Sequence, residues 1–176
     1  MIKVKFLEAF LLVTIATITY NFNLESTDVI KLNMPLKTIK FYGYLGVLPF
    51  ILFTIAPWLS SNLSEISLKG ISFYGGVIIS FLGGTAWGWA PNSAGSIRFG
   101  IACTFINLMI IFFVFKNILI ALVICFLVFP LFLYFEAQNN STFKNNSEYA
   151  EMRRILTLLV TICYFICLAF VFNPYT

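Results

Sequence analysis

The chain has 176 residues, of which 60% are hydrophobic and only 10% are charged, whereas a typical soluble domain has about a quarter charged residues. A soluble fold of this size has too much surface for its volume to hide so many apolar side chains, so the composition excludes an ordinary globular domain and indicates burial in lipid. The net charge of +4 comes from scattered residues rather than a dense basic cluster, which argues against nucleic-acid binding.

The first apolar run, residues 6–22, has an ambiguous pattern. It follows Lys3 and Lys5 and contains Glu8. Three interpretations are open: a sixth membrane span, an uncleaved interfacial helix, or a cleaved signal peptide, although no clear small-residue cleavage motif follows the run. We therefore treat residues 1–35 as an N-terminal hydrophobic helix with a polar linker.

Residues 36–176 are predicted to form a five-helix transmembrane core. A helix needs about 20 apolar residues to cross the hydrocarbon core of a bilayer. Five runs approach this length without any Asp, Glu, Lys or Arg: Phe41–Leu59, Ile71–Ala90, Phe99–Phe115, Ile118–Phe135 and Ile155–Phe172. Pro49 and Pro130 lie inside runs and predict kinks there. The predicted fold class is an all-α integral membrane protein, with the N-terminal hydrophobic helix as a candidate sixth span.

Polar residues between the runs predict how the helices are connected. Asn62, Glu65 and Lys69 separate the first two runs and are interpreted as a break in the helical pattern. Only Lys116 and Asn117 separate the third run from the fourth, so these two helices should form a tight antiparallel hairpin.

The longest polar stretch, residues 136–154, is rich in asparagine and serine and is typical of a flexible linker. Arginine near a helix N-terminus opposes the helix dipole, so we expect Arg153 to have a partner inside the protein, such as Glu136 or a backbone carbonyl. Arg154 is expected to point to lipid and to set orientation. A solvated loop is a simpler interpretation than a membrane-enzyme site for the charged residues of this stretch: Glu136, Glu148, Glu151, Arg153 and Arg154.

The basic residues also predict the orientation of the core. With five spans, Lys69 and Lys116 lie on one face, and nine lysines and arginines lie on the other. If residues 6–22 span as well, the count becomes seven against four, with the same orientation of the core. The positive-inside rule then places the segment before the core, Arg98 and residues 136–154 in the cytoplasm, or in the mitochondrial matrix.

The second run carries small residues at every fourth position. Helices in lipid have no hydrophobic drive to associate, and such stripes let two backbones approach closely. We interpret the stripe as a packing face inside the bundle, with a homodimer face and a backbone-lined substrate path as alternatives. On this basis Gly84→Leu should destabilise the bundle more than Gly70→Leu does. The helix-packing residues are Ser72, Gly76, Ser80, Gly84 and Gly88.

Asn107 is the most polar side chain deep inside any run. Interhelical hydrogen bonds in membranes contribute roughly 0.6–2 kcal/mol each, so a structural role is the simpler interpretation, and a substrate contact is the alternative. The candidates to pair with Asn107 are the hydroxyl residues of the runs: Thr54, Ser80, Thr85, Thr104, Thr157 and Thr161.

The chain contains no histidine, which excludes imidazole-ligated haem, histidine-bound metals and histidine general bases. Its four cysteines lie inside apolar runs, where burial blunts thiol reactivity, so they are interpreted as small packing residues. We therefore predict no catalytic residue, no metal site and no cofactor.

The segment Tyr74–Gly88 contains Ser-Phe-Leu-Gly-Gly at positions 80–84 and Trp-Gly at positions 87 and 88. This pattern resembles the signature of a small membrane family known only as domain of unknown function 3429, whose animal relatives are called transmembrane protein 69 and look mitochondrial. Ala86 stands where the family usually has histidine or arginine, which puts any role for a charge at that position in doubt.

Two other segments are similar to the same family. Leu45–Phe50 resembles its first helix, and Tyr149, Arg153 and Leu156-Thr157 resemble the entry to its last helix. The resemblance covers about residues 36–172. It implies the five-helix core but brings no established biochemistry with it.

These observations favour a multi-pass membrane protein that is not an enzyme, acting as a scaffold, assembly or accessory component. A small transporter or channel for a neutral solute is the alternative, and a membrane enzyme ranks third. The expected partners are the lipid bilayer and either another membrane protein or a second copy of the chain, with no nucleic acid. The bacterial inner membrane is the favoured location, and the mitochondrial inner membrane is the alternative.

Overall fold

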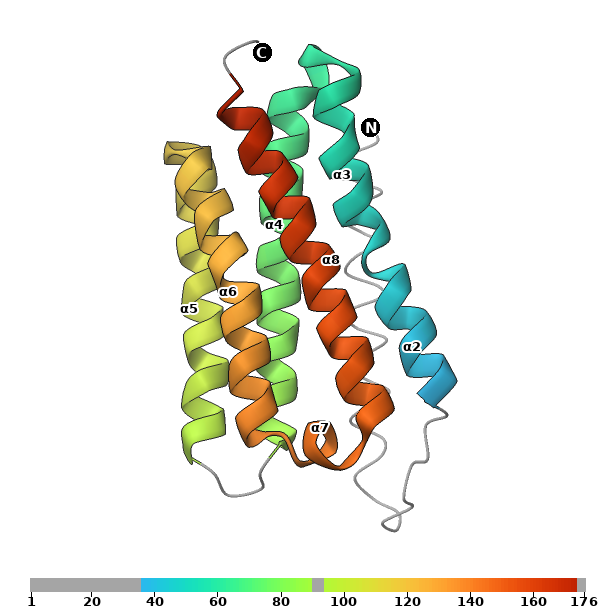
Figure 1. The fold of residues 1–176 in the computed structure, drawn as a ribbon. Helices are drawn as coiled ribbons and strands as arrows, with labels where there is room; N and C mark the ends of the chain where they lie inside the picture. Colours follow the sequence, from blue (N-terminus) through green and yellow to red (C-terminus); the bar gives the residue numbers. More distant parts are fainter. Residues whose placement is uncertain (1–35, 90–93, 174–176) are drawn as a thin grey trace, which may run out of the picture. The chain divides into compact units, whose positions relative to one another are not determined.

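The computed structural model describes residues 36–89 and 94–173, which form a bundle of helices without any strand in that part of the chain (Figure 1). The hydrophobic helix predicted for residues 6–22 lies outside the described residues. In chain order the elements are α2 (Leu36–Leu45), α3 (Leu48–Leu59), α4 (Ser61–Thr85), the 3₁₀ turn η1 (Ala86–Gly88), α5 (Ala94–Lys116), α6 (Ile118–Asn139), α7 (Ser141–Asn145) and α8 (Ser147–Val171).

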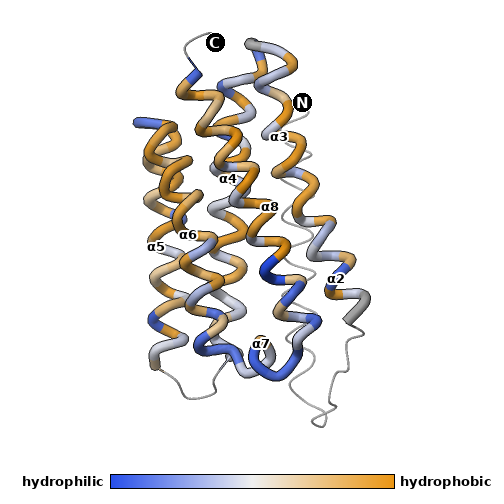
Figure 2. The backbone as a smooth tube through the Cα atoms, viewed as in Figure 1, coloured by the Kyte–Doolittle hydropathy of each residue, from blue (hydrophilic) through white to orange (hydrophobic). Residues whose placement is uncertain are grey.

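Five helical stretches are long and apolar enough to cross a membrane, which confirms the predicted five-helix core. Figure 2 shows that hydrophobic residues dominate their length, and that hydrophilic residues gather at the end of the bundle where α7 lies. The chain is thus a candidate multi-pass membrane protein. The five spans are Thr38–Leu59, Asn62–Gly88, Ala94–Lys116, Ile118–Asn139 and Ser147–Val171.

The first span is two helices, and the kink predicted at Pro49 is in fact a break between α2 and α3 at Gly46 and Val47. Pro49 lies in the first turn of α3, where its missing N–H leaves no helical hydrogen bond unmade. The Tyr74 hydroxyl of α4 donates a hydrogen bond of 2.9 Å to the Gly46 carbonyl oxygen. A neighbouring helix therefore satisfies a carbonyl group at the break, as lipid-embedded backbone requires.

The break predicted at Asn62, Glu65 and Lys69 is wrong, because all three residues lie inside α4. Ser60 alone connects α3 to α4. Glu65 and Lys69 form an ion pair one turn apart, which supports a helix that extends beyond the apolar core. These polar residues therefore belong to the part of α4 that extends beyond the lipid, and they do not end the helix.

The flexible linker predicted for residues 136–154 is also wrong. Asn140 caps α7 by accepting a hydrogen bond from the Thr142 N–H at 2.9 Å, and Asn146 caps α8 by accepting one from the Tyr149 N–H at 3.0 Å. Asparagine is a preferred N-cap residue because its side chain satisfies a backbone donor that the helix leaves unpaired. Two asparagines of this stretch therefore mark the starts of helices rather than a flexible linker.

The predicted hairpin between the third and fourth spans is present, with Asn117 as its only connecting residue. Asn117 also caps α6 by accepting a hydrogen bond of 3.1 Å from the Leu119 N–H. The spans α4 and α8 meet inside the bundle, where the fully buried Tyr164 hydroxyl donates to the Ile71 carbonyl oxygen at 2.9 Å. The ring of Tyr164 packs against Phe50 of α3 and Phe129 of α6, so one side chain ties four helices together.

The predicted packing stripe holds only at its start. Ser72 and Gly76 are buried, whereas Gly84 and Gly88 are exposed and a side chain at either would meet no atom within 4 Å. A step of four residues advances about 40° around a helix, so four steps carry Gly88 about 160° away from Ser72. The expected order of the leucine variants is therefore reversed, because a Cβ at Gly70 would lie 2.8 Å from the Phe53 ring.

The buried side of α4 follows alternating steps of four and three residues instead. A seven-residue repeat drifts by only about 20°, which keeps its members on one face. A Cβ at Gly83 would lie 2.5 Å from Cys103 and 3.1 Å from the Gly100 carbonyl oxygen of α5. The close contact between α4 and α5 is thus built by glycines of both helices. The buried members of the repeat are Ser72, Gly76, Ile79, Gly83 and Ala86.

Reporter fusions at Asn145 and Thr176 are expected to score on opposite sides of the membrane, with Asn145 in the cytoplasm or matrix. Asn145 lies in α7, before the last span, and that span ends at Val171 at the opposite end of the core; the α7 end carries six of the described lysines and arginines against two at the other end. Two reporters on the same side would contradict the five-span core. The six are Lys37, Lys40, Arg98, Lys144, Arg153 and Arg154.

Candidate functional site: the Glu136 cluster and the adjoining pocket

Glu136 is the one charged residue of the described chain whose side chain is buried, with 1% of its surface exposed. Its Oε2 atom accepts a hydrogen bond of 2.8 Å from Arg153 Nε and forms an ion pair with Arg153 Nη2 at 2.7 Å. Its Oε1 atom accepts from the Tyr149 hydroxyl at 2.8 Å and from Asn140 Nδ2 at 3.3 Å. Both carboxylate oxygens therefore have polar partners, as a buried charge requires.

The helices around α7 explain how these residues meet. Glu136 lies in the last turn of α6, and α7 reverses the chain so that the first two turns of α8 run back beside it. Tyr149 and Arg153 are four residues apart and share one face of α8. A carboxylate at a helix C-terminus faces the negative end of the dipole, so Glu136 depends on the arginine for compensation. We call Glu136, Asn140, Tyr149 and Arg153 the Glu136 cluster.

The partner predicted for Arg153 is confirmed, since its guanidinium pairs with Glu136. Arg154 has an exposed side chain whose guanidinium lies 5.7 Å from the centre of the Phe143 ring. Neither arginine stands at the helix start that the sequence indicated, because α8 begins at Ser147. The solvated loop expected at Glu136 is wrong for that residue, whereas Glu148 and Glu151 are exposed.

A second ion pair lies at the same end of the bundle. Lys40 of α2 and Glu148 of α8 approach to 2.9 Å, with much of both side chains exposed. Such surface pairs contribute little to stability. The contact nevertheless places the start of the first span beside the start of the last one, on the side that carries most of the basic residues.

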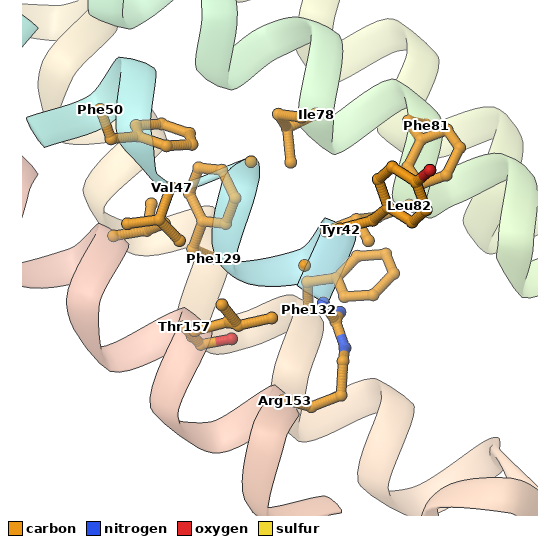
Figure 3. Close-up of a pocket in the computed structure, with 14 residues that line it drawn as sticks. Tyr42, Val47, Phe50, Ile78, Phe81, Leu82, Phe129, Phe132, Arg153 and Thr157 are labelled. Carbon is orange, nitrogen blue, oxygen red and sulfur yellow. The ribbon is translucent and has the colours of Figure 1, made fainter. Parts of the chain in front are cut away.

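An apolar pocket of about 170 Å³ adjoins the cluster (Figure 3). Its walls come from α2 and α3 on both sides of their break, and from α4, α6 and α8. Arg153 is the only charged residue that lines it. The sequence did not predict this pocket, because it depends on how the break between α2 and α3 sits against the other spans.

The side-chain oxygen of Asn107 does not form the interhelical hydrogen bond that the sequence predicted. Asn107 Oδ1 and Ser80 Oγ are buried atoms without a hydrogen-bond partner. A side chain at Gly76 would overlap Asn107 Oδ1, so the close approach of α4 and α5 puts that oxygen against backbone C–H groups, which are weak donors. Most of the other expected partners instead donate a hydrogen bond from the hydroxyl group to a backbone carbonyl oxygen of their own helix. These residues are Thr54, Thr85, Thr104 and Thr161.

The cysteines Cys103, Cys125, Cys163 and Cys167 are buried and free. Cys167 Sγ lies 3.8 Å from Thr54 Oγ1, so this thiol contacts a neighbouring span. Among the described residues no three histidine, cysteine, aspartate or glutamate side chains are placed to hold a metal ion together.

The family model described as "Protein of unknown function (DUF3429)" matches residues 35–169. The chain belongs to this family. The matched range includes all five spans except the last residues of α8, and it includes the whole Glu136 cluster. No curated protein and no solved structure matches the chain.

Three members of the cluster were named from the sequence: Tyr149 and Arg153 belong to the segment that resembles the entry to the family's last helix, and Glu136 was a candidate partner of Arg153. The hydrogen bond from Asn140 was not predicted, because an asparagine-rich stretch between apolar runs is typical of a flexible linker. The family match covers the whole cluster and assigns no activity to it.

Proposed function

We propose that this chain is a non-catalytic component of a bacterial inner membrane, or of the mitochondrial inner membrane, serving as a scaffold, assembly or accessory subunit. One observation supports the proposal above the others. The only charged side chain buried in the described residues is Glu136, and both its oxygens are held by residues of α8 and of the connection between α6 and α7. A buried carboxylate paired in this way supports a structural role in joining these helices.

Purification from its native membrane in a mild detergent, followed by size-exclusion chromatography and native mass spectrometry, tests this proposal. A scaffold or accessory subunit should elute in a defined complex that reforms from separated components. The Arg154→Gln variant is a suitable positive control, because Arg154 is exposed and its replacement should leave the bundle intact. A wild-type chain that is monomeric from every membrane source would count against the proposal.

The unpaired atoms Ser80 Oγ and Asn107 Oδ1 favour one alternative, a path for a small neutral solute along the contact of α4 and α5. Buried polar groups usually have partners, so two orphans near one helix contact could serve a passing solute or water. Uptake of a neutral solute into proteoliposomes, measured for wild type and Asn107→Leu, would separate the two functions. A scaffold gives no uptake above that of empty vesicles with either chain.

A further inference from the structure

The pocket beside the Glu136 cluster owes its shape to the break in the first span. Gly43 and Gly46 lie on the pocket wall at the end of α2, where the chain leaves one helix before α3 begins. A Cβ at Gly43 would approach Leu156 of α8 to 3.0 Å, so α2 lies close to α8 below the break. The space left behind the break is enclosed by apolar side chains such as Phe50, Phe129 and Val160.

The pocket opens to the side of the bundle that faces lipid. Tyr42 of α2 and Phe81 of α4 both line it, and their side chains are 65% and 63% exposed. Figure 3 shows these two residues on one side of the pocket and Phe50 and Val47, which are buried, on the other. The entrance therefore lies between two membrane spans rather than at an aqueous surface.

One end of the pocket is polar and lies at the level of the headgroups. Arg153 uses its Nε–H and one Nη2–H on Glu136, while a guanidinium carries five N–H donors in all. Glu136 is not among the lining residues, so the Arg153 guanidinium borders the pocket whereas the Glu136 carboxylate does not. Thr157 lines the wall one turn deeper, and its side chain points into the space in Figure 3.

The dimensions fit a segment of hydrocarbon. From Arg153 to Val160 the wall runs seven residues along α8, which corresponds to about 10 Å. An apolar cavity of about 150 Å³ is known to hold a benzene molecule, so about 170 Å³ accommodates a comparable number of carbons. The deep part is lined by apolar side chains, which offer few hydrogen-bond partners to a water molecule.

We propose that this pocket binds one anionic phospholipid of the surrounding bilayer, with an acyl chain between the helices and the phosphate at Arg153. Charge complementarity selects this occupant, because Arg153 has N–H donors that Glu136 does not use, and the α7 end carries six lysines and arginines of the described chain against three glutamates. A guanidinium also matches phosphate oxygens in geometry. The inference is independent of the proposed scaffold role, since a transporter could hold such a lipid equally well.

Native mass spectrometry of the full chain, delipidated in detergent and titrated with phosphatidylglycerol or phosphatidylcholine, tests this inference. Wild type is expected to retain one phosphatidylglycerol at least tenfold more strongly than phosphatidylcholine. Val160→Phe fills the pocket and should weaken phosphatidylglycerol retention at least tenfold. Leu158→Phe places the same residue type on the outer face of α8, where Leu158 is 60% exposed, and should behave as wild type.

Ile78→Phe adds a ring from the opposite wall, on α4, and should weaken retention in the same way as Val160→Phe. Equal retention of the two lipids by wild type would overturn the inference even if both pocket variants failed to fold. Undiminished retention in a folded Val160→Phe or Ile78→Phe chain would overturn it as well.

Discussion

Arg153→Gln is expected to lower the free energy of unfolding by about 3–5 kcal/mol, the range found when one partner of a buried ion pair is removed. The substitution leaves Glu136 with a negative charge in a site where 1% of its surface is exposed. The charge also faces the C-terminal end of the α6 dipole, which adds to the cost. Titration with a denaturing detergent in mixed micelles measures the change.

Two control variants separate this effect from a general loss of positive charge. Arg154→Gln should change the free energy of unfolding by no more than about 0.5 kcal/mol, as is usual for an exposed position. The double variant Glu136→Gln/Arg153→Gln should regain most of the loss, because neither buried charge remains. If Arg153→Gln and Arg154→Gln behave alike, both arginines serve only to orient the chain in the membrane.

Gly75→Ala is expected to cost about 3 kcal/mol, at the upper end of the usual range for an overpacked core. The added methyl group would overlap the Tyr164 hydroxyl, which is fully buried and bonded to Ile71. The hydroxyl cannot move aside without giving up that hydrogen bond. The same micelle titration measures this loss.

A double-variant cycle tests whether the clash with Tyr164 is the cause. Tyr164→Phe removes the oxygen, so Gly75→Ala should cost at least about 1 kcal/mol less in that background. Gly84→Ala is the matched control, because the same change on the same helix meets open space. Alanine is the better helix former by up to about 1 kcal/mol, so this control should be neutral or stabilising. Equal losses at both glycines would contradict the packing described here.

Hydropathy alone predicted the number and order of the spans, because any polar residue in lipid is costly and the five runs contain no charge. The ends of the helices were less predictable. Polar residues such as Asn62 and Asn146 look alike in composition, yet one continues a helix and the other caps one. The outcome depends on local hydrogen bonds, which composition does not contain.

The candidate site was predicted in part. The unfavourable position of Arg153 relative to the helix dipole pointed to a partner, and Glu136 was among the candidates. The packing stripe was misjudged at Gly84 because a period of four was assumed where the buried face of α4 repeats every seven residues. The pocket could not be predicted, since its walls come from residues up to 118 positions apart, from Tyr42 to Val160.

The connections at Ser60 and Asn117 are each one residue long, so the two ends of the bundle offer different amounts of surface to a water-soluble protein. At the end of the bundle where Ser60 and Asn117 lie, the described chain has helix ends but no longer loop that an antibody could bind or a protease could cleave. On the other side, α7 and the first turns of α8 present a folded platform of polar residues. Within the described residues, the surface that a water-soluble protein could recognise therefore lies mainly on one side of the membrane, where Arg154 and Lys144 are exposed.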